Sequence, residues 1–405
     1  MTTTTNNEQK KLNFSSEREQ SQACLNSAEH EKNQGRKVLN VPNLRFPEFQ
    51  GEWEKCKVSD LLDFYSTNSL SWDKLEYGTT NIQNLHYGLI HVGLPTMVDI
   101  DKDNLPNIID GNVPKNYELC KEGDIVFADA SEDTNEVAKA VEYYNLNGKK
   151  VVCGLHTIHG RDNKNKTVVG YKGYAFSSMS FHHQIRRIAQ GTKIYSINSK
   201  NFSECYVGIP SKDEQQKIAD LLRLIDERIA TQNKIIEDLK KLKSAIIENV
   251  FDDKHSERLQ LDNVGSYIRG LTYSSNDVVE HGGTLVMRSN NIVNGSLLDY
   301  NNNVVFVNKQ MSAEQQLQNG DVVICMANGS SSLVGKSSFY DGSCHSPITV
   351  GAFCGIYRSK EPIVKWLFQT NKYRRYIWNS LQGGNGAIAN LNGEDILHMS
   401  FSIPN

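Results

Sequence analysis

Apolar and polar residues alternate along this chain in two different ways. From residue 39 to residue 211, short apolar runs such as Ile125-Val126-Phe127 and Val151-Val152-Cys153 are separated by Gly, Asn and Asp. Runs of this length between turn-forming residues are typical of β-strands. The same texture returns at residue 253 and continues to residue 405. The pattern therefore predicts an α+β protein with two β-rich domains, at 39–211 and 253–405.

Between these domains the pattern predicts one long helix over residues 212–252. No Gly or Pro occurs from Asp213 to Val250, and Pro210-Ser211 precede the stretch. Apolar residues recur there at alternating spacings of four and three, the signature of a coiled-coil seam. At 1.5 Å per residue, the stretch from Asp213 to Val250 would be about 57 Å long as a helix. The apolar seam positions are Ile218, Leu222, Ile225, Ile229, Ile236, Leu239 and Ile246.

The seam predicts a partner. A helix with one apolar stripe needs a second surface to bury it, and the segments beside it in the sequence are β-rich. We therefore expect helices of other subunits to cover the seam, so that the long helix is coiled-coil-like.

The polar leader, residues 1–38, contains too few apolar residues to build a core, so it is predicted to be disordered or a frayed helix. No run of about 18 apolar residues occurs in the chain, which predicts no membrane span. The first residues lack the hydrophobic segment of a secretory signal. We expect a cytoplasmic protein.

The eight cysteines form no CxxC pair, and the chain is too long to need a disulfide framework. We interpret them as reduced, mostly buried residues. His156, His159, His182 and His183 have no matching Cys/His quartet, so they are interpreted as surface or DNA-facing residues. No metal site is predicted.

The two β-rich segments share short motifs in the same order, at offsets of 194 to 207 residues. Each match is short, but their shared order indicates a duplicated domain. The matched pairs are Gly123-Asp124-Ile125-Val126 with Gly320-Asp321-Val322-Val323, 84–88 with 291–295, and 206–210 with 400–404.

The net charge is −3, but the charges are segregated. Residues 145–200 hold ten Lys/Arg and one acid, and residues 343–392 hold six Lys/Arg and one acid. A basic segment at the same place in both copies is a candidate phosphate-binding surface, the alternative being a solvated charged face. The candidate DNA-binding residues are Arg161, Lys164, Lys166, Arg186, Arg187 and Lys193 in the first copy, and Arg269, Arg288, Asn290, Lys336, Arg358, Arg374 and Arg375 in the second.

Three motifs resemble sites of other chemistry. Residues 329–337 resemble a phosphate-binding loop, but five residues instead of four separate Gly329 from Gly335-Lys336, so a polar DNA-facing loop is predicted. The corresponding loop in the first copy, 129–135, is acidic. Its carboxylates can accept hydrogen bonds from cytosine N4 or face solvent, and the sequence does not distinguish these two roles. The glycines at 383–386 lack the context of a dinucleotide site. With no methyltransferase tetrapeptide and no acidic nuclease cluster, no catalytic centre is predicted.

Several motifs together resemble a known family. The strand ending at Ile209-Pro210 is followed by Glu214-Gln215-Gln216-Lys217-Ile218-Ala219 and the long helix. Leu44-Arg45-Phe46-Pro47-Glu48-Phe49 stands before Gly51-Glu52-Trp53, and the two Gly-Asp motifs recur at mid-domain. Over residues 41–405 the chain resembles the specificity subunits of type I restriction–modification systems.

The resemblance implies two target-recognition domains, each reading one half of a bipartite double-stranded DNA site. It implies that the helix spaces the half-sites and docks methyltransferase subunits, which carry S-adenosylmethionine. A restriction and motor subunit, using ATP and Mg²⁺, would join for cleavage. No cofactor is expected in this chain.

The sequence departs from the family after Ile403-Pro404, where a second spacer helix is expected and is not found. Two alternatives remain open at this stage. The chain can be the specificity module of a fused restriction–methylation enzyme, which the neighbouring gene would reveal. It can also be a coiled-coil scaffold with two protein-binding domains, which would lack salt-sensitive DNA binding.

Overall fold

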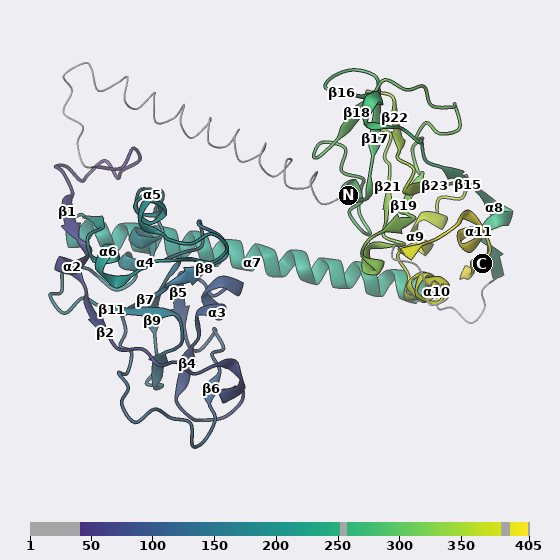
Figure 1. Cartoon of the computed structure of the whole chain (residues 1–405). Helices are drawn as coiled ribbons and strands as arrows, with labels where there is room; N and C mark the ends of the chain where they lie inside the picture. The colour runs from purple at the N-terminus through teal and green to yellow at the C-terminus, as the bar shows by residue number, and fades with distance from the viewer. Residues whose placement is uncertain (1–40, 252–256, 382–388, 404–405) are drawn as a thin grey trace, which may run out of the picture. The chain divides into compact units, whose positions relative to one another are not determined.

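The computed structural model describes residues 41–251, 257–381 and 389–403 (Figure 1). The leader predicted at 1–38 lies outside these residues. The chain forms two compact units, the first ending at Ala230 and the second beginning at Thr231, both inside helix α7 (Lys212–Phe251). We call the β-rich part before this helix domain 1 and the β-rich part after it domain 2. Two domains joined by a long helix confirm the fold class predicted from the sequence.

Domain 1 contains two main sheets. The first has the order β2 (Asp63–Tyr65), β11 (Thr157–Arg161), β7 (Ile125–Ala128), β9 (Ala140–Asn145) and β5 (Met97–Asp99). Its strands are antiparallel except β5, which runs parallel to β9. The second sheet has the order β10 (Val151–Cys153), β4 (Gln83–Leu85), β6 (Asn107–Ile108) and β3 (Leu75–Glu76). The strands β7 and β10 lie where the sequence predicts them.

Short elements close domain 1. Strand β1 (Glu54–Lys57) pairs with β13 (Tyr206–Ile209), which brings the two ends of the domain together, and β8 (Ala130–Ser131) pairs with β12 (Tyr195–Ser196). Four phenylalanines from β7 and the helices stack edge to face in the core. The helices are η2 (Trp72–Lys74), α2 (Val58–Leu61), α3 (Tyr87–Val92), α4 (Tyr171–Phe176), α5 (Met179–Ile188) and α6 (Ser199–Ser203).

Domain 2 repeats this plan. One sheet has the order β15 (Gly265–Arg269), β23 (Cys354–Ser359), β19 (Val322–Cys325) and β21 (Ser337–Phe339). The other has the order β16 (Val278–Val279), β18 (Val305–Val307), β17 (Thr284–Met287) and β22 (Ile348–Val350). The end-closing pair is β14 (Glu257–Gln260) with β25 (Ser400–Ile403), and β20 (Ala327–Asn328) pairs with β24 (Ala389–Asn390). The helices are α8 (Leu261–Val264), α9 (Val364–Leu367), α10 (Asn371–Leu381), α11 (Gly393–Leu397), η3 (Ser275–Asp277), η4 (Ser289–Asn291) and η5 (Ser331–Leu333).

The duplication extends to individual hydrogen bonds. The Gly123 amide donates to the Tyr143 carbonyl at 2.7 Å, and the Gly320 amide donates to the Tyr340 carbonyl at 2.8 Å. Both glycines have positive φ angles, 83° and 92°, which residues with a Cβ adopt at a cost. The repeated Gly-Asp motif therefore marks the same turn before the same strand in both domains.

One matched pair from the sequence is wrong. In β4, Leu85 lies opposite Cys153, and in β17, Met287 lies opposite Val350. Asn84 therefore corresponds to Val286, whereas Asn291 lies beyond the strand in η4. The short match of 84–88 with 291–295 misled because Asn and Gly recur wherever a strand gives way to a turn.

The first turn of α7 is fixed to domain 1 by the motifs that carry the family resemblance. Arg45 donates to both carboxylate oxygens of Glu214, at 2.6 and 2.7 Å, and the Trp53 indole donates to the same group at 3.1 Å. The fully buried Gln215 side chain accepts from the Val168 amide and donates to the Pro210 carbonyl, both at 2.9 Å. These contacts set the direction in which the helix leaves the domain.

The last turns of α7 pack on domain 2. Ile247 is 7% exposed, and the Glu248 carboxylate accepts from the Asn371 amide at the start of α10. Lys243 lies over the ring of Trp366, with its ammonium 5.3 Å from the ring centre. Lys243, one of the two polar residues at the seam positions of the helix, thus has a partner in domain 2. In the part of the chain that the structure describes, no helix is both long and apolar enough to cross a bilayer.

Candidate nucleic-acid interface and partner-helix face

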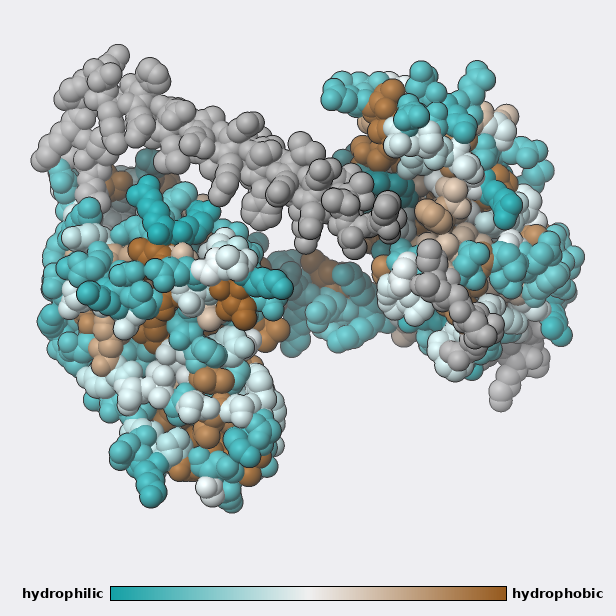
Figure 2. Space-filling view, in the orientation of Figure 1, coloured by the Kyte–Doolittle hydropathy of each residue, from teal (hydrophilic) through white to brown (hydrophobic). Residues whose placement is uncertain are grey.

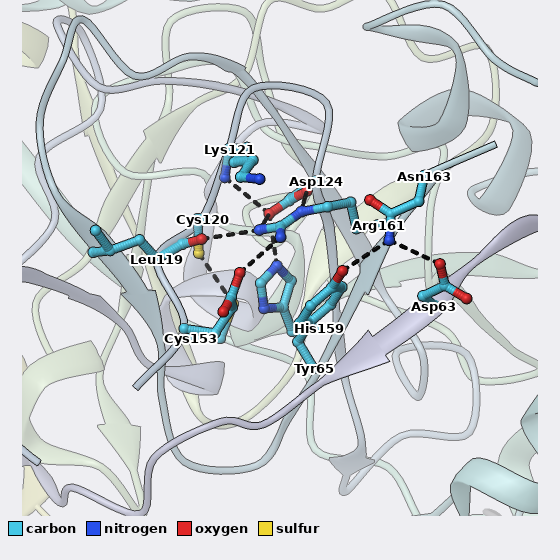
Figure 3. A network of polar contacts seen from close by, with 11 residues as sticks. Asp63, Tyr65, Leu119, Cys120, Lys121, Asp124, Cys153, His159, Arg161 and Asn163 are labelled. Carbon is cyan, nitrogen blue, oxygen red and sulfur yellow. Dashed lines mark hydrogen bonds and ion pairs between the residues drawn. The ribbon is translucent and has the colours of Figure 1, made fainter. Parts of the chain in front are cut away.

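Two of the arginines predicted to bind DNA donate to buried carboxylates of their own domains. The Arg161 guanidinium donates to both oxygens of Asp124, at 2.8 and 2.7 Å, and to Glu118 at 2.7 Å, while it stacks on Tyr65 (Figure 3). Arg161 is 7% exposed. Four hydrogen bonds, the fourth to the Leu119 carbonyl at 2.9 Å, hold this buried guanidinium within domain 1, where it supports β11.

Arg358 occupies the corresponding place in domain 2. It donates to both oxygens of Asp321, at 2.8 and 2.7 Å, and to the Gln316 carbonyl. These carboxylate contacts could not be predicted from the sequence, because it shows charge and not burial. The Gly-Asp motif, which supplies the buried carboxylates, was the available signal that these arginines have partners within their own domains.

Helix α5 carries two of the exposed cations of domain 1. Arg186 and Arg187 lie in its last turn, and Arg186 donates to the Asn135 side chain at 3.4 Å and contacts His183. Burial and the nearby Arg186 charge lower the pKa of His182, so its imidazole is neutral at physiological pH. Because Arg186 contacts Asn135, helix α5 and the acidic loop 129–135 form one surface, although the two residues are 51 positions apart in the sequence.

Helix α10 carries the corresponding pair in domain 2. Arg374 and Arg375 are exposed on it, and the Trp378 side chain beside them is 63% exposed. These residues line an open hollow together with Asn371. A large aromatic ring exposed among cations suits stacking on a flexible base or ribose, and the sequence analysis did not single it out.

The remaining predicted cations are scattered. Lys164 and Lys193 are exposed, whereas Lys166 is half-buried against Glu54 at 2.9 Å. In domain 2, Arg269 and Asn290 are exposed, and Arg288 and Lys336 are half-buried. Asn328 donates to Ser289 at 3.4 Å, which brings the segment 288–290 next to the loop after β20.

The loops after β7 and β19 lie in equivalent places but differ in chemistry. In domain 1, Asp129 contacts His156 at 3.2 Å and Asp133 accepts from the Asn135 side chain at 3.1 Å. In domain 2 the serine-rich loop passes through η5 into strand β21. A phosphate-binding loop leads into a helix, so this loop has a different form. The glycines at 383–386 lie outside the described residues.

The seam of α7 is open to solvent along its middle. Ile225, Ile229, Ile236, Leu239 and Ile246 are 44–58% exposed, whereas Ile218 packs against the domain 1 core. Apolar residues are visible on α7 between the domains (Figure 2). The apolar face is wider than predicted, because Leu221, Leu224, Ile235 and Leu242 are also 45–56% exposed.

Near domain 2 the seam becomes a groove. Leu239, Leu242, Ile246 and Val250 of the helix form one wall, and Ile363 and Trp366 form the other, around a hollow of about 470 Å³. Almost all of its lining is apolar. An apolar groove beside an exposed helical stripe is suited to receive another helix.

Comparison with known proteins agrees with this architecture. Residues 51–241 match the family model of the type I restriction modification DNA specificity domain. This segment comprises domain 1 and most of the helix that follows it. The matched segment thus places domain 1 in the class of DNA specificity domains.

Individual relatives point the same way. Over 220 residues the chain is 26% identical to a putative type I restriction enzyme MjaX specificity subunit of Methanocaldococcus jannaschii, covering 53% of this chain and 49% of that protein. Over 152 residues it is 34% identical to the EcoKI specificity subunit of Escherichia coli K12, covering 35% and 30%. The matches therefore span half or less of these relatives. Domain 1 and most of α7 thus match the type I restriction modification DNA specificity domain, and the chain is similar to specificity subunits of type I restriction enzymes.

A solved structure extends the likeness in fold to both domains. The type I restriction–modification S subunit from M. genitalium aligns with 90% of this chain and 87% of its own, with a TM-score of 0.53 and 15% identity. At this identity the likeness concerns the fold.

Proposed function

We propose that this chain is the DNA-recognition subunit of a type I restriction–modification complex, with each domain reading one half of a bipartite target. It acts without a catalytic centre of its own. Its helix α7 docks methyltransferase subunits. The observation that carries the proposal is the duplication. The same fold occurs before and after helix α7, and each copy has an exposed cationic helix, α5 in domain 1 and α10 in domain 2. Helix α7 itself has an open apolar face.

The two cationic helices have side chains that suit contact with DNA. Exposed arginines neutralise phosphate and can donate two hydrogen bonds to guanine. The loops after β7 and β19 lie close to these surfaces and differ between the domains, with carboxylates in one and serine hydroxyls in the other. Different polar groups on one framework would let the two domains read different half-sites.

The apolar face of α7 suits protein partners. Ten of its large apolar side chains are 41–58% exposed, and their burial would contribute about 25 cal/mol per Å². A face this wide is larger than the seam of a single pairing and has room for helices on more than one side. S-adenosylmethionine would come with the methyltransferase subunit, and ATP with Mg²⁺ would come with a restriction subunit.

Methylome sequencing tests the proposal. Cells that express this chain with a type I methyltransferase subunit should acquire adenine methylation at a split motif with a fixed gap. The double variant Ile229→Ser, Ile236→Ser tests the docking role of the helix. It alters only exposed seam positions, so the chain should still fold but lose the methylation.

Exchanging the loop residues Glu132→Ser and Asp133→Ser should change one half of the motif and leave the other half and the gap intact. Methylation without a gap, a motif unaffected by either set of substitutions, or no methylation with a methyltransferase that demonstrably binds the chain would overturn the proposal.

A further inference from the structure

Three metal-ligating side chains meet in the core of domain 1. They are Cys120, Cys153 at the end of β10, and His159 in the middle of β11 (Figure 3). One ligand atom of each lies within 4.8 Å of the others, and the two sulfur atoms are 3.4 Å apart. All three residues are buried, and His159 is completely so. Their spacing matches no sequence motif, so only the fold reveals them.

One nitrogen of the histidine is unused. His159 Nε2 lies 2.7 Å from an oxygen of Asp124, whereas Nδ1 has no hydrogen-bond partner among the described residues. When Nε2–H donates to the carboxylate, Nδ1 keeps its lone pair free. A carboxylate that orients the outer nitrogen of a histidine is the usual support of a metal-bound imidazole.

Domain 2 shows that the fold itself does not need these polar groups. The amides of Cys120 and Leu317 donate to equivalent carbonyls, those of Val151 and Ile348. By the strand registers, Val350 takes the place of Cys153 and Ile356 takes the place of His159. Where domain 2 packs three aliphatic side chains, domain 1 has two thiols and an imidazole. All three positions differ together.

A fourth polar group completes the contrast. The buried Tyr143 hydroxyl has no hydrogen-bond partner among the described residues and is in electrostatic contact with both thiols. The corresponding Tyr340 hydroxyl bonds to the backbone of Cys344. The orphaned Tyr143 hydroxyl can therefore be a fourth ligand or donate to a metal-bound sulfur.

We propose that domain 1 binds one zinc ion through Cys120 Sγ, Cys153 Sγ and His159 Nδ1. Zn²⁺ prefers this set of sulfur and nitrogen ligands, held about 3.5–3.8 Å apart around a tetrahedral centre. The two sulfur atoms, 3.4 Å apart, are already close to that separation, and the imidazole lies within 4.8 Å of them. Binding breaks two S–H bonds, both protons pass to solvent, and two thiolates balance the charge of the cation.

Metal titration of the purified full-length chain tests this. After reduction and removal of metal with a chelator, the chain is titrated with Co²⁺ as a coloured probe and then with Zn²⁺. One Co²⁺ per chain should produce sulfur-to-cobalt charge-transfer absorption together with tetrahedral d–d bands, and one equivalent of Zn²⁺ should abolish both.

The variant is built from the residues of domain 2, so that it retains a packed core: Cys120→Leu, Cys153→Val, His159→Ile. It should fold, as judged by circular dichroism, and lose the absorption. The matched control alters Cys325 and Cys354, which lie opposite each other on β19 and β23 without a nearby histidine. The variant Cys325→Ala, Cys354→Ala should keep the full cobalt signal.

The outcomes are distinct. No stoichiometric absorption from the reduced chain, absorption that survives in the triple variant, or loss of signal in the control pair overturns the zinc site. A Cys120–Cys153 disulfide, found by peptide mass analysis in the chain isolated from cells, also overturns it. None of these results depends on DNA binding, so the proposed function stands or fails separately.

Discussion

The two domains share one plan, and the places where they agree differ in kind from the places where they diverge. Both keep the Gly-Asp turn and an arginine that donates to the carboxylate of that turn. Arg161 donates to Asp124, and Arg358 donates to Asp321. They diverge in the exposed loops after β7 and β19 and in the buried cluster around His159. Shared residues hold the sheets in register, whereas divergent exposed residues are candidates for reading different DNA.

The shared salt bridge also differs in depth between the domains. The side chain of Arg161 is 8% exposed and also binds Glu118, whereas that of Arg358 is 20% exposed. An arginine left without its carboxylate is harder to rehydrate in domain 1. The comparison therefore predicts unequal dependence of the two domains on the same motif.

The largest expected effect comes from removing that carboxylate. Asp124→Ala leaves Arg161 buried without its main partner and should destabilise domain 1 by roughly 3–5 kcal/mol. Asp321→Ala should destabilise domain 2 by roughly 1–3 kcal/mol, because Arg358 can reach water. Hydrogen exchange of peptides from β7 and β19, with a chelator present, measures each domain separately. Equal losses in the two domains would contradict the argument.

The next comparison uses adjacent isoleucines on α7. Ile247 is 7% exposed against domain 2 and Ile246 is 53% exposed on the seam. Ile247→Ala should cost roughly 2–4 kcal/mol of unfolding free energy, measured by urea denaturation. Ile246→Ala should change it by less than about 0.5 kcal/mol. The order reverses for partner binding, where only the exposed residue faces the proposed methyltransferase helix. A chain equally sensitive at both positions would show that the seam is not free.

Much of this plan could be predicted from the sequence, for identifiable reasons. The long helix could be predicted because the spacing of apolar residues and the absence of Gly and Pro are local signals. The duplication was found through the Gly-Asp turn, whose geometry demands a glycine. Long-range pairing was not readable. No local sequence signal shows that Arg161 contacts Asp124, that Cys120 lies beside Cys153, or that Ile247 is buried while Ile246 is exposed. Each of these features depends on segments that are distant in the sequence.

Among the candidate DNA contacts, the exposed arginine pairs offer a test between domains. Arg186→Ala with Arg187→Ala, and separately Arg374→Ala with Arg375→Ala, should each weaken DNA binding about tenfold or more and lower the salt slope by about 1 to 2. Fluorescence anisotropy with duplex DNA at several salt concentrations measures both quantities. Lys212→Ala, at the exposed start of α7, serves as a single-charge control. An unchanged salt slope would remove these helices from the interface.

The smallest effect is a difference in acid sensitivity, and it separates the buried carboxylate from its surroundings. Burial acts to raise the pKa of Asp124, but hydrogen bonds from His159 and Arg161 outweigh it and hold the pKa below its ordinary value. A depressed folded-state pKa contributes stability that is fully present above the unfolded value of about 3.9 and is lost as the pH falls through the folded value.

Domain 1 of the wild-type chain should therefore lose unfolding free energy progressively below about pH 4, whereas the variant Asp124→Asn, which is already weakened, should lose less over the same range. The measurement is the free energy of exchange for β7 peptides, corrected for the intrinsic pH dependence of amide exchange and normalised to β19 peptides of the same molecule. A parallel decline in wild type and variant would mean that other carboxylates dominate the acid response. The Asp124 network would then stabilise the domain through hydrogen bonding that does not depend on its charge.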